Sequence, residues 1–229
     1  MLWKPGKLRY DVPKAYQPIT LFNTLAKLLS SIIAEGLSYL METHQLIPST
    51  HFGGRPGHLM AGSLHLLVDM IKAAWHHRQV ASVLFLDIEG AFLNTMMAHL
   101  LHNLRKRRVP KVFISYMDNM LTGCWTQLKF DDYTSSWFKL DNGIGQGDPL
   151  SMLSYLYYNS DVLEVLKGHN KVGLGYVDDM ALVAVASDFR SVHRKLKQMM
   201  TWPAGAVEWS GAHNSHFEAT KSTLLDFTR

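Results

Sequence analysis

Apolar residues that recur every three or four positions predict most of the helices of this chain. The pattern runs over residues 21–42 and again over 59–77, which predicts two long amphipathic helices. The same spacing predicts shorter helices over 94–107, 111–121 and 188–201.

Shorter apolar runs with a different pattern predict strands. Residues 80–86 form a nearly continuous apolar run, which is typical of a buried strand. Residues 172–176 and 180–185 are two further runs that predict a hairpin, and a last strand is expected near 222–227. Alternating residues within 124–141 predict a separate hairpin.

Glycine and proline mark the connections between these elements. Residues 1–20 contain three prolines and are expected to be extended or looped, and residues 48–57 form a Gly/Pro-rich loop. A second glycine-rich loop, 142–148, leads into Pro149. Because proline is favourable in a first helical turn, a helix is expected over 149–164.

The irregular alternation of helices and hairpins predicts an α+β fold, an antiparallel sheet with helices on one face, and argues against a doubly wound parallel sheet. A length of 229 residues allows one large domain or two small ones. No internal repeat or low-complexity tract interrupts this organisation.

Composition narrows the function without fixing it. The chain is 47% hydrophobic and 18% charged, so a sizeable core is expected and wholesale disorder is excluded. The formal charge of +4 permits a polyanionic partner but does not require one. The single cysteine, Cys124, excludes a disulfide framework and fits a reducing setting. No apolar run reaches the ~18 residues that a membrane span needs, so no membrane partner is expected.

Three carboxylates stand where the predicted strands end. Asp87 follows the strand 80–86, and Asp178 and Asp179 lie at the tip of the 172–185 hairpin. If the strands are neighbours, these hard oxygen donors meet in a manner that suits Mg²⁺. The alternative is two unrelated, solvated strand ends, and the double acid Asp131-Asp132 illustrates it as a plain turn.

Three motifs in order favour the first interpretation. Residues 86–92 read Leu-Asp-Ile-Glu-Gly-Ala-Phe, residues 145–151 read Gly-Gln-Gly-Asp-Pro-Leu-Ser, and residues 176–179 read Tyr-Val-Asp-Asp. They resemble the first metal-binding motif, the Gln-Gly-x-Pro-Leu-Ser motif and the Tyr-x-Asp-Asp box of reverse transcriptases. Each motif is weak alone, whereas the three together, in the order and approximate spacing of the family, are specific.

The resemblance covers nearly the whole chain. Residues 4–7 and 16–19 resemble the opening fingers segment, residues 52–57 resemble Phe-Gly-Phe-Arg-x-Gly, and residues 214–221 resemble the Asn-x-x-Lys-Thr region. The best match is the reverse transcriptase of a non-LTR (LINE-like) retrotransposon.

This resemblance implies a right-hand polymerase palm with partial fingers and no thumb. Residues 1–80 would be a fingers-like part, with an interleaved boundary, and residues 81–229 the palm. A thumb and an endonuclease are expected on a longer parent polyprotein. The family acts at chromosomal targets, which suggests the nucleus, although no localisation signal is evident.

The resemblance also implies the roles of the acids. Asp87 and Asp178 would hold two Mg²⁺ ions, for which Mn²⁺ is a possible substitute, with Asp179 a third, less central carboxylate. The Ile88 carbonyl would be a further ligand. Lys221 stands where the family has a lysine proposed to protonate the leaving pyrophosphate; the alternative is an ordinary surface lysine.

Other residues would contact the substrates, namely an RNA template, a DNA primer and a dNTP. Phe92 would close against the 2′ side of the sugar and favour deoxynucleotides, unless it is only a core aromatic residue. Gln146 and Gly147 would line the incoming nucleotide and the template base. Lys4 and Lys7 would touch nucleotide phosphates, or are solvated loop lysines. The reaction would be phosphoryl transfer, driven by positioning and charge stabilisation.

Two departures from the family pattern leave an alternative open. Gln17 stands where the family usually has an arginine that grips triphosphate oxygens, and residues 58–60 replace an expected polar run. Together with the missing thumb, they favour a catalytically degenerate retroelement relic that retains at most nucleic-acid binding. A viral RNA-directed RNA polymerase is disfavoured, because those enzymes usually carry Gly-Asp-Asp.

Overall fold

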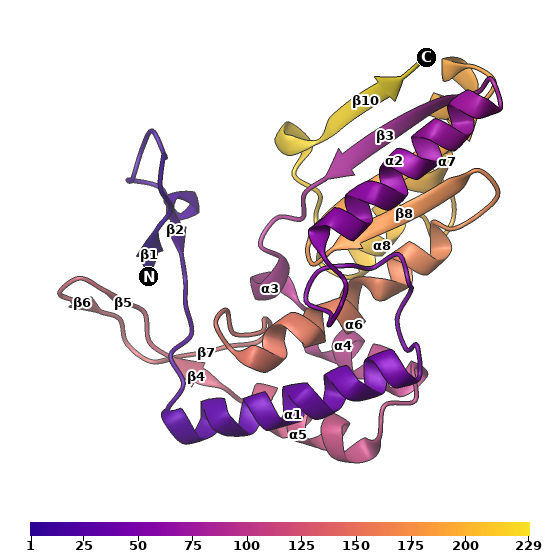
Figure 1. Ribbon diagram of the computed structural model, residues 1–229. Coiled ribbons are helices and arrows are strands. Elements are labelled where there is room, and N and C mark those ends of the chain that lie inside the picture. Colours follow the sequence, from indigo (N-terminus) through magenta and orange to yellow (C-terminus); the bar gives the residue numbers. More distant parts are fainter.

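A four-stranded antiparallel sheet, in the order β10–β3–β9–β8, forms the centre of the molecule (Figure 1). The computed structural model describes all residues, 1–229. The four strands of this sheet are β3 (Val80–Leu86), β8 (Lys171–Tyr176), β9 (Asp179–Ala186) and β10 (Thr223–Phe227). Strand β3 lies in the middle and pairs with β9 along its whole length, from Val80 opposite Ala186 to Leu86 opposite Met180. The antiparallel sheet and all four predicted strands are therefore confirmed.

Helices surround this sheet and form the rest of the core. The α-helices are α1 (Thr24–Thr43), α2 (Met60–His76), α3 (Ala91–Asn94), α4 (Met97–Lys106), α5 (Lys111–Leu121), α6 (Pro149–Val165), α7 (Phe189–Thr201) and α8 (Ala206–Ala212). Two short 3₁₀ helices, Pro13–Ala15 and Ala219–Lys221, complete the set. None of the helices combines the length and the apolar character that crossing a membrane would require.

The sheet is covered on both faces, and the expectation of helices on one face only is wrong. Val83 and Val183 point into a smaller apolar cluster with helix α2. Their neighbours Leu182 and Ala184 point to the other face, into the main cluster with α6 and α7. Figure 1 shows α2 in front of the sheet and α7 behind it. Because both faces are buried, the strands need apolar residues at nearly every position.

Three short strand pairings lie outside the central sheet. In the N-terminal arm, β1 (Leu2–Trp3) pairs with β2 (Tyr16–Gln17), so the expected extended segment contains a small ladder. The predicted 124–141 hairpin is confirmed as two nested ladders, β4 (Trp125–Thr126) with β7 (Phe138–Lys139) and β5 (Lys129–Phe130) with β6 (Tyr133–Thr134). The Tyr16 and Phe130 rings meet edge to face at 4.9 Å between centroids, which joins the arm to the hairpin.

One helix prediction needs correction, and one helix was missed. The expected helix 94–107 is instead α3 followed by α4, because Thr95 leaves the helical conformation (ψ 118°) and its hydroxyl bonds back to the Ala91 carbonyl at 3.0 Å. Helix α8 was not predicted at all. Its buried face consists of Ala206, Trp209 and Ser210, too short a pattern to indicate a helix from spacing alone.

Candidate active site

A tight turn carries two of the three predicted acids. Strands β8 and β9 are paired up to Tyr176 opposite Asp179, which leaves Val177 and Asp178 as the two turn residues. Val177 adopts a left-handed backbone conformation, with φ of 59°. A β-branched residue rarely adopts this conformation, and such strained residues cost on the order of 1–3 kcal/mol. Strain of this kind persists only where surrounding contacts enforce it.

The third acid lies on the neighbouring strand, at the same end. Leu86 is the last residue of β3 and pairs with Met180 of β9. The next residue, Asp87, follows β3 at the same end of the sheet at which Asp179 begins β9. The pairing of β3 with β9 therefore brings Asp87 to the tip of the β8–β9 hairpin, as the sequence predicted.

The segment after Asp87 is held against the C-terminal part of the chain. The Asp87 carbonyl accepts a hydrogen bond from the Glu218 amide at 2.8 Å, and the Glu89 amide donates to the His216 carbonyl at 2.9 Å. Ile88 lies between these bonds, opposite Phe217. The Ile88 carbonyl itself accepts no hydrogen bond from the chain, although Ile88 is buried.

The electrostatics of the three acids reflect their proximity. Burial raises the pKa of Asp178, and repulsion from Asp179 and Asp87 raises it further. Burial and the charge of Asp87 likewise raise the pKa of Asp179. The one cation that offsets this negative charge is Lys221, whose Nζ lies 2.6 Å from Asp87 Oδ2, and this bond raises the lysine's own pKa.

The donor set fits a hard divalent cation. In this conformation the acidic and histidine side chains of the chain do not close into a ready group of three metal ligands, and the Lys221 ammonium occupies Asp87 instead. However, the charge of Asp87 raises the pKa of both Asp178 and Asp179, and the Ile88 oxygen accepts no hydrogen bond from the chain. Oxygen donors with uncompensated negative charge are what Mg²⁺ or Mn²⁺ would neutralise.

Phe92 is half-buried beside this group and rests on a fully buried tyrosine. Its ring stacks on Tyr155 of α6, with centroids 5.1 Å apart and an angle of 24° between the planes. The Tyr155 hydroxyl is buried without a hydrogen-bond partner, and burial raises its pKa well above the ordinary value. The Phe92 ring therefore packs on Tyr155, while part of the side chain is exposed to solvent. This arrangement fits either a substrate contact or a core role.

Gln146 and Gly147 connect the N-terminal arm to the start of α6. The Gln146 carbonyl accepts a hydrogen bond from the Thr20 amide at 2.8 Å, while its side-chain Oε1 is buried without a partner. Gly147 has a φ of 97°, a conformation that disfavours any residue with a side chain. The Gln146 oxygen therefore lacks the hydrogen bond that buried polar groups usually make.

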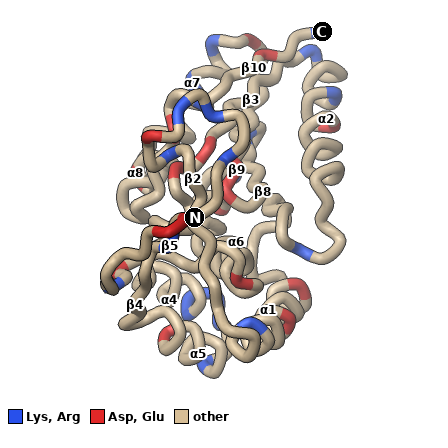
Figure 2. The backbone as a smooth tube through the Cα atoms, turned by 90° about the vertical axis from the view of Figure 1, so that its left-hand side faces the viewer, with Lys and Arg blue, Asp and Glu red and all other residues tan.

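The two N-terminal lysines are not joined to the acids. Lys4 and Lys7 make no ion pair and no side-chain hydrogen bond. A different lysine, Lys14, connects the arm to the site, with its Nζ 2.6 Å from Glu89 and 3.3 Å from Glu218. Sequence reasoning missed Lys14, because no motif marks it and both partners are distant in the chain. In the view of Figure 2, charges of both signs are interspersed over the elements, and β2 lies in front of acidic positions near β9.

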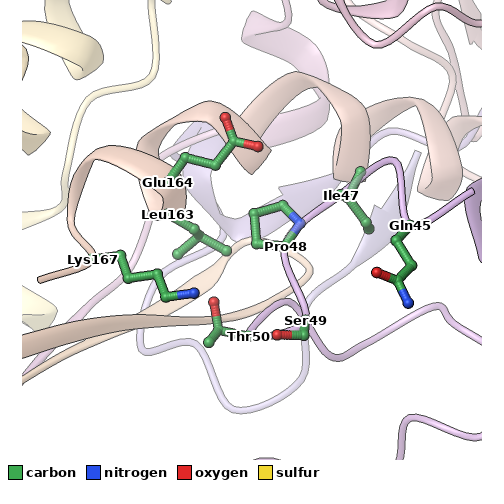
Figure 3. Close-up of a pocket in the computed structure, with 8 residues that line it drawn as sticks. All are labelled: Gln45, Ile47, Pro48, Ser49, Thr50, Leu163, Glu164 and Lys167. Atoms are coloured by element: carbon green, nitrogen blue, oxygen red, sulfur yellow. The ribbon is translucent and has the colours of Figure 1, made fainter.

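One hollow of the surface lies away from the acids. It encloses about 220 Å³ and is lined by Gln45, Ile47, Pro48, Ser49, Thr50, Leu163, Glu164 and Lys167 (Figure 3). None of these residues is among the predicted site residues. Its mixed lining and open shape indicate no specific ligand, so the acid group remains the better candidate for chemistry.

Comparisons with known proteins find similar sequences along nearly the whole chain. The family model described as "Reverse transcriptase (RNA-dependent DNA polymerase)" matches residues 3–223. The chain is 28% identical to a probable RNA-directed DNA polymerase from transposon X-element of Drosophila melanogaster, over 100% of this chain and 25% of the relative. It is 26% identical to an RNA-directed DNA polymerase from mobile element jockey of Drosophila funebris, over the same shares. The chain thus spans about a quarter of the length of the curated relatives that it matches.

Solved structures with the same fold come from telomerases. A telomerase from Candida albicans in complex with a fragment of telomeric RNA matches 88% of this chain and 34% of its own, with a TM-score of 0.61 and 12% identity. A telomerase from Candida tropicalis matches 89% of this chain and 34% of its own, with a TM-score of 0.63 and 9% identity. At such identities the likeness shows the fold alone, a polymerase palm. Because the family model spans almost the entire sequence, the chain belongs to the reverse transcriptase (RNA-dependent DNA polymerase) family.

Proposed function

We propose that this chain is the fingers-and-palm part of an RNA-directed DNA polymerase, which extends a DNA primer along an RNA template with dNTPs. The observation that carries the proposal is the meeting of Asp87, Asp178 and Asp179 at adjoining strand ends, where burial and the charge of Asp87 raise the pKa of both Asp178 and Asp179. In two unrelated, solvated strand ends, the acid of one strand would not change the pKa of the acids on the other. The mutual repulsion instead favours a site built for cations.

The cofactor in this proposal is a pair of Mg²⁺ ions, for which Mn²⁺ could substitute. Asp87, Asp178, Asp179 and the Ile88 carbonyl would hold them. When bound, such a pair neutralises the triphosphate and makes the primer 3′-hydroxyl more acidic. Asp87 and Asp178 would bind both ions. Asp179 would contribute less to binding them, since it is the most exposed of the three acids.

Lys221 has a role of its own in the proposal. Its raised pKa keeps a proton on Nζ at neutral pH, and the ammonium lies against Asp87 while no cation is bound. Binding of cations by Asp87 would weaken this ion pair and leave the Lys221 proton available to the leaving pyrophosphate. The lysine would then act as a general acid.

Phe92 would select deoxynucleotides by filling the space beside the sugar 2′ carbon. We expect Phe92→Val to narrow the preference for dGTP over GTP, measured as the ratio of kcat/KM, by about 10–200-fold, because valine leaves room for a hydroxyl. Phe113, a half-buried aromatic residue of α5, offers a matched control as Phe113→Val. Equal discrimination by Phe92→Val and the wild type would assign Phe92 to the core alone.

The polymerase part would work within a longer protein. We infer a fingers-like part in residues 1–80, interleaved with the palm of 81–229, since α2 packs against β3. The length of the relatives is consistent with a parent polyprotein that supplies a thumb and an endonuclease. Lys4, Lys7, Gln146 and Gly147 would contact the nucleotide and the template at the border between the two parts.

A primer-extension assay tests the proposed function. Mg²⁺-dependent incorporation of dTTP on poly(rA)/oligo(dT) by this chain is expected to exceed that of Asp178→Ala. Incorporation no greater than that of the variant would favour the degenerate-relic alternative. A gel-shift assay with the same duplex would then show whether nucleic-acid binding is retained.

Gln17 is the specific observation that favours the relic. It is exposed on β2, and a glutamine cannot provide the charged fork of an arginine. We expect Gln17→Arg to increase kcat/KM for dTTP by about 10–100-fold, the effect of one charge-assisted contact to a phosphate. Gln45→Arg, which adds the same charge in the exposed turn after α1, is the control. No gain from Gln17→Arg would mean that this position does not limit activity.

A further inference from the structure

A chain of buried polar groups holds the strained turn of the β8–β9 hairpin. Asn159, on α6, donates a hydrogen bond from Nδ2 to the Val177 carbonyl at 2.6 Å. Its Oδ1 lies 2.8 Å from Nε2 of His51, which comes from the loop before α2. Asn159 is 1% exposed and His51 is not exposed at all, so water does not compete for the bond between them.

The direction of each bond is fixed by chemistry. Since the Asn159 amide donates to a carbonyl, its oxygen must be the acceptor, and His51 must carry its proton on Nε2. The other ring nitrogen of His51 has no partner, which agrees with an unprotonated Nδ1. Burial lowers the pKa of His51 to about 4, so the ring is neutral at neutral pH and its one N–H points at Asn159.

The backbone next to His51 confines the same turn from a second side. The Phe52 amide donates to the Gly175 carbonyl at 2.7 Å, and the Gly175 amide donates to the Thr50 carbonyl at 3.0 Å. At Gly53 a Cβ atom would lie only 2.7 Å from Cγ2 of Val177. The loop therefore packs directly on the turn, and contacts from both sides enforce the left-handed conformation of Val177.

We propose that His51 and Asn159 are positioning residues, which hold the hairpin tip so that Asp178 and Asp179 face Asp87. Neither side chain contacts the acids, and both act through the Val177 carbonyl. The proposal rests on the proposed function, because its consequence is the geometry of a cation site. Partners behind metal ligands commonly contribute 10–100-fold to metal affinity.

Four variants separate positioning from general stability. His51→Leu and Asn159→Leu remove the hydrogen bonds but keep much of the volume. His51→Gln keeps them, because a glutamine Nε2 reaches as far as the imidazole Nε2 and also donates. Asn103→Leu is the matched control: Asn103 is 2% exposed and donates to the Tyr158 carbonyl of α6 at 3.0 Å, but it does not contact the hairpin.

Two measurements on the whole chain decide the question. The first is the dissociation constant for Mn²⁺, from the electron paramagnetic resonance signal of the free ion. The second is hydrogen exchange of the amides in residues 176–180. We expect His51→Leu and Asn159→Leu to weaken Mn²⁺ binding by about 10–100-fold and to speed exchange at the tip. We expect His51→Gln to retain most of the affinity, and Asn103→Leu to lose stability without either effect.

The exchange data keep this proposal separable from the proposed function. If the wild type binds no Mn²⁺, the polymerase proposal fails, whereas faster exchange in His51→Leu but not in His51→Gln would still support the positioning role. Exchange at 176–180 that is equal in the wild type, His51→Leu and Asn159→Leu would overturn it. Loss of Mn²⁺ binding to the same extent in Asn103→Leu would also overturn it.

Discussion

Replacing Asp178 with asparagine should abolish Mg²⁺-dependent primer extension and, at the same time, make the protein more stable. Activity is expected to fall by at least about 10³-fold, because one ligand of both cations is lost. The free energy of unfolding is expected to rise by about 0.5–1 kcal/mol, since asparagine removes a charge that burial and two neighbouring acids disfavour. Thermal denaturation followed by circular dichroism, together with the dTTP assay, measures both effects.

The stabilisation should depend on pH in a defined direction. The pKa of Asp178 is raised in the folded state, so its charged form destabilises the fold at neutral pH and the penalty fades as the pH falls through that pKa. The advantage of Asp178→Asn should therefore be largest at neutral pH and vanish below the ordinary value of 3.8. Asp131→Asn, in the exposed turn of the other hairpin, should change neither activity nor stability. An Asp178→Asn variant no more stable than the wild type would contradict the assigned repulsion.

Truncating Arg55 should have the largest effect on stability. Its side chain is only 5% exposed, and its guanidinium binds both carboxylate oxygens of Glu42 at 2.8 Å. It also donates to the carbonyls of Pro48 at 3.1 Å and His51 at 2.8 Å. Removing one partner of such a pair costs about 3–5 kcal/mol, so Arg55→Ala should be partly unfolded at moderate temperature. Urea denaturation gives the loss directly.

The acid dependence of this ion pair provides a second signature. The hydrogen bond from Arg55 lowers the pKa of Glu42, so the pair stabilises the fold above the ordinary value of 4.5 and loses this effect as the pH falls through the lowered pKa. Arg55→Ala should lack that part of the acid dependence. Arg9→Ala, which breaks a fully exposed ion pair with Asp11, should leave the denaturation midpoint unchanged. A midpoint equally unchanged in Arg55→Ala would show that the loop does not depend on this arginine.

Local patterns were sufficient to find the strands and the acids at their ends. The runs 80–86 and 180–185 have the composition of buried strands, and Asp87 and Asp178 stood out because carboxylates there are costly without a cation. The same runs held a signal for helices on both faces, since a strand buried on one side only would alternate. The expectation of one covered face overlooked this continuous apolar pattern.

Contacts between distant segments could not be predicted from spacing. Asn159 reads as one polar residue within an apolar helix, and His51 as one residue of a glycine-rich loop, and only the folded chain shows that they share a hydrogen bond. Lys14 reaches Glu89 and Glu218 in the same unmarked way. The pairing of β3 with β9, which brings Asp87 to Asp178, followed from the family resemblance and not from any periodicity. The roles of Phe92, Gln146 and Lys221 stay predictions.

The most direct test is to locate manganese in crystals of the chain grown with Mn²⁺, by anomalous scattering. We expect a peak between residues 87 and 178, with a carboxylate oxygen from each within about 2.0–2.6 Å of one ion. Manganese bound elsewhere, with these two side chains too far apart to reach a common ion, would contradict it.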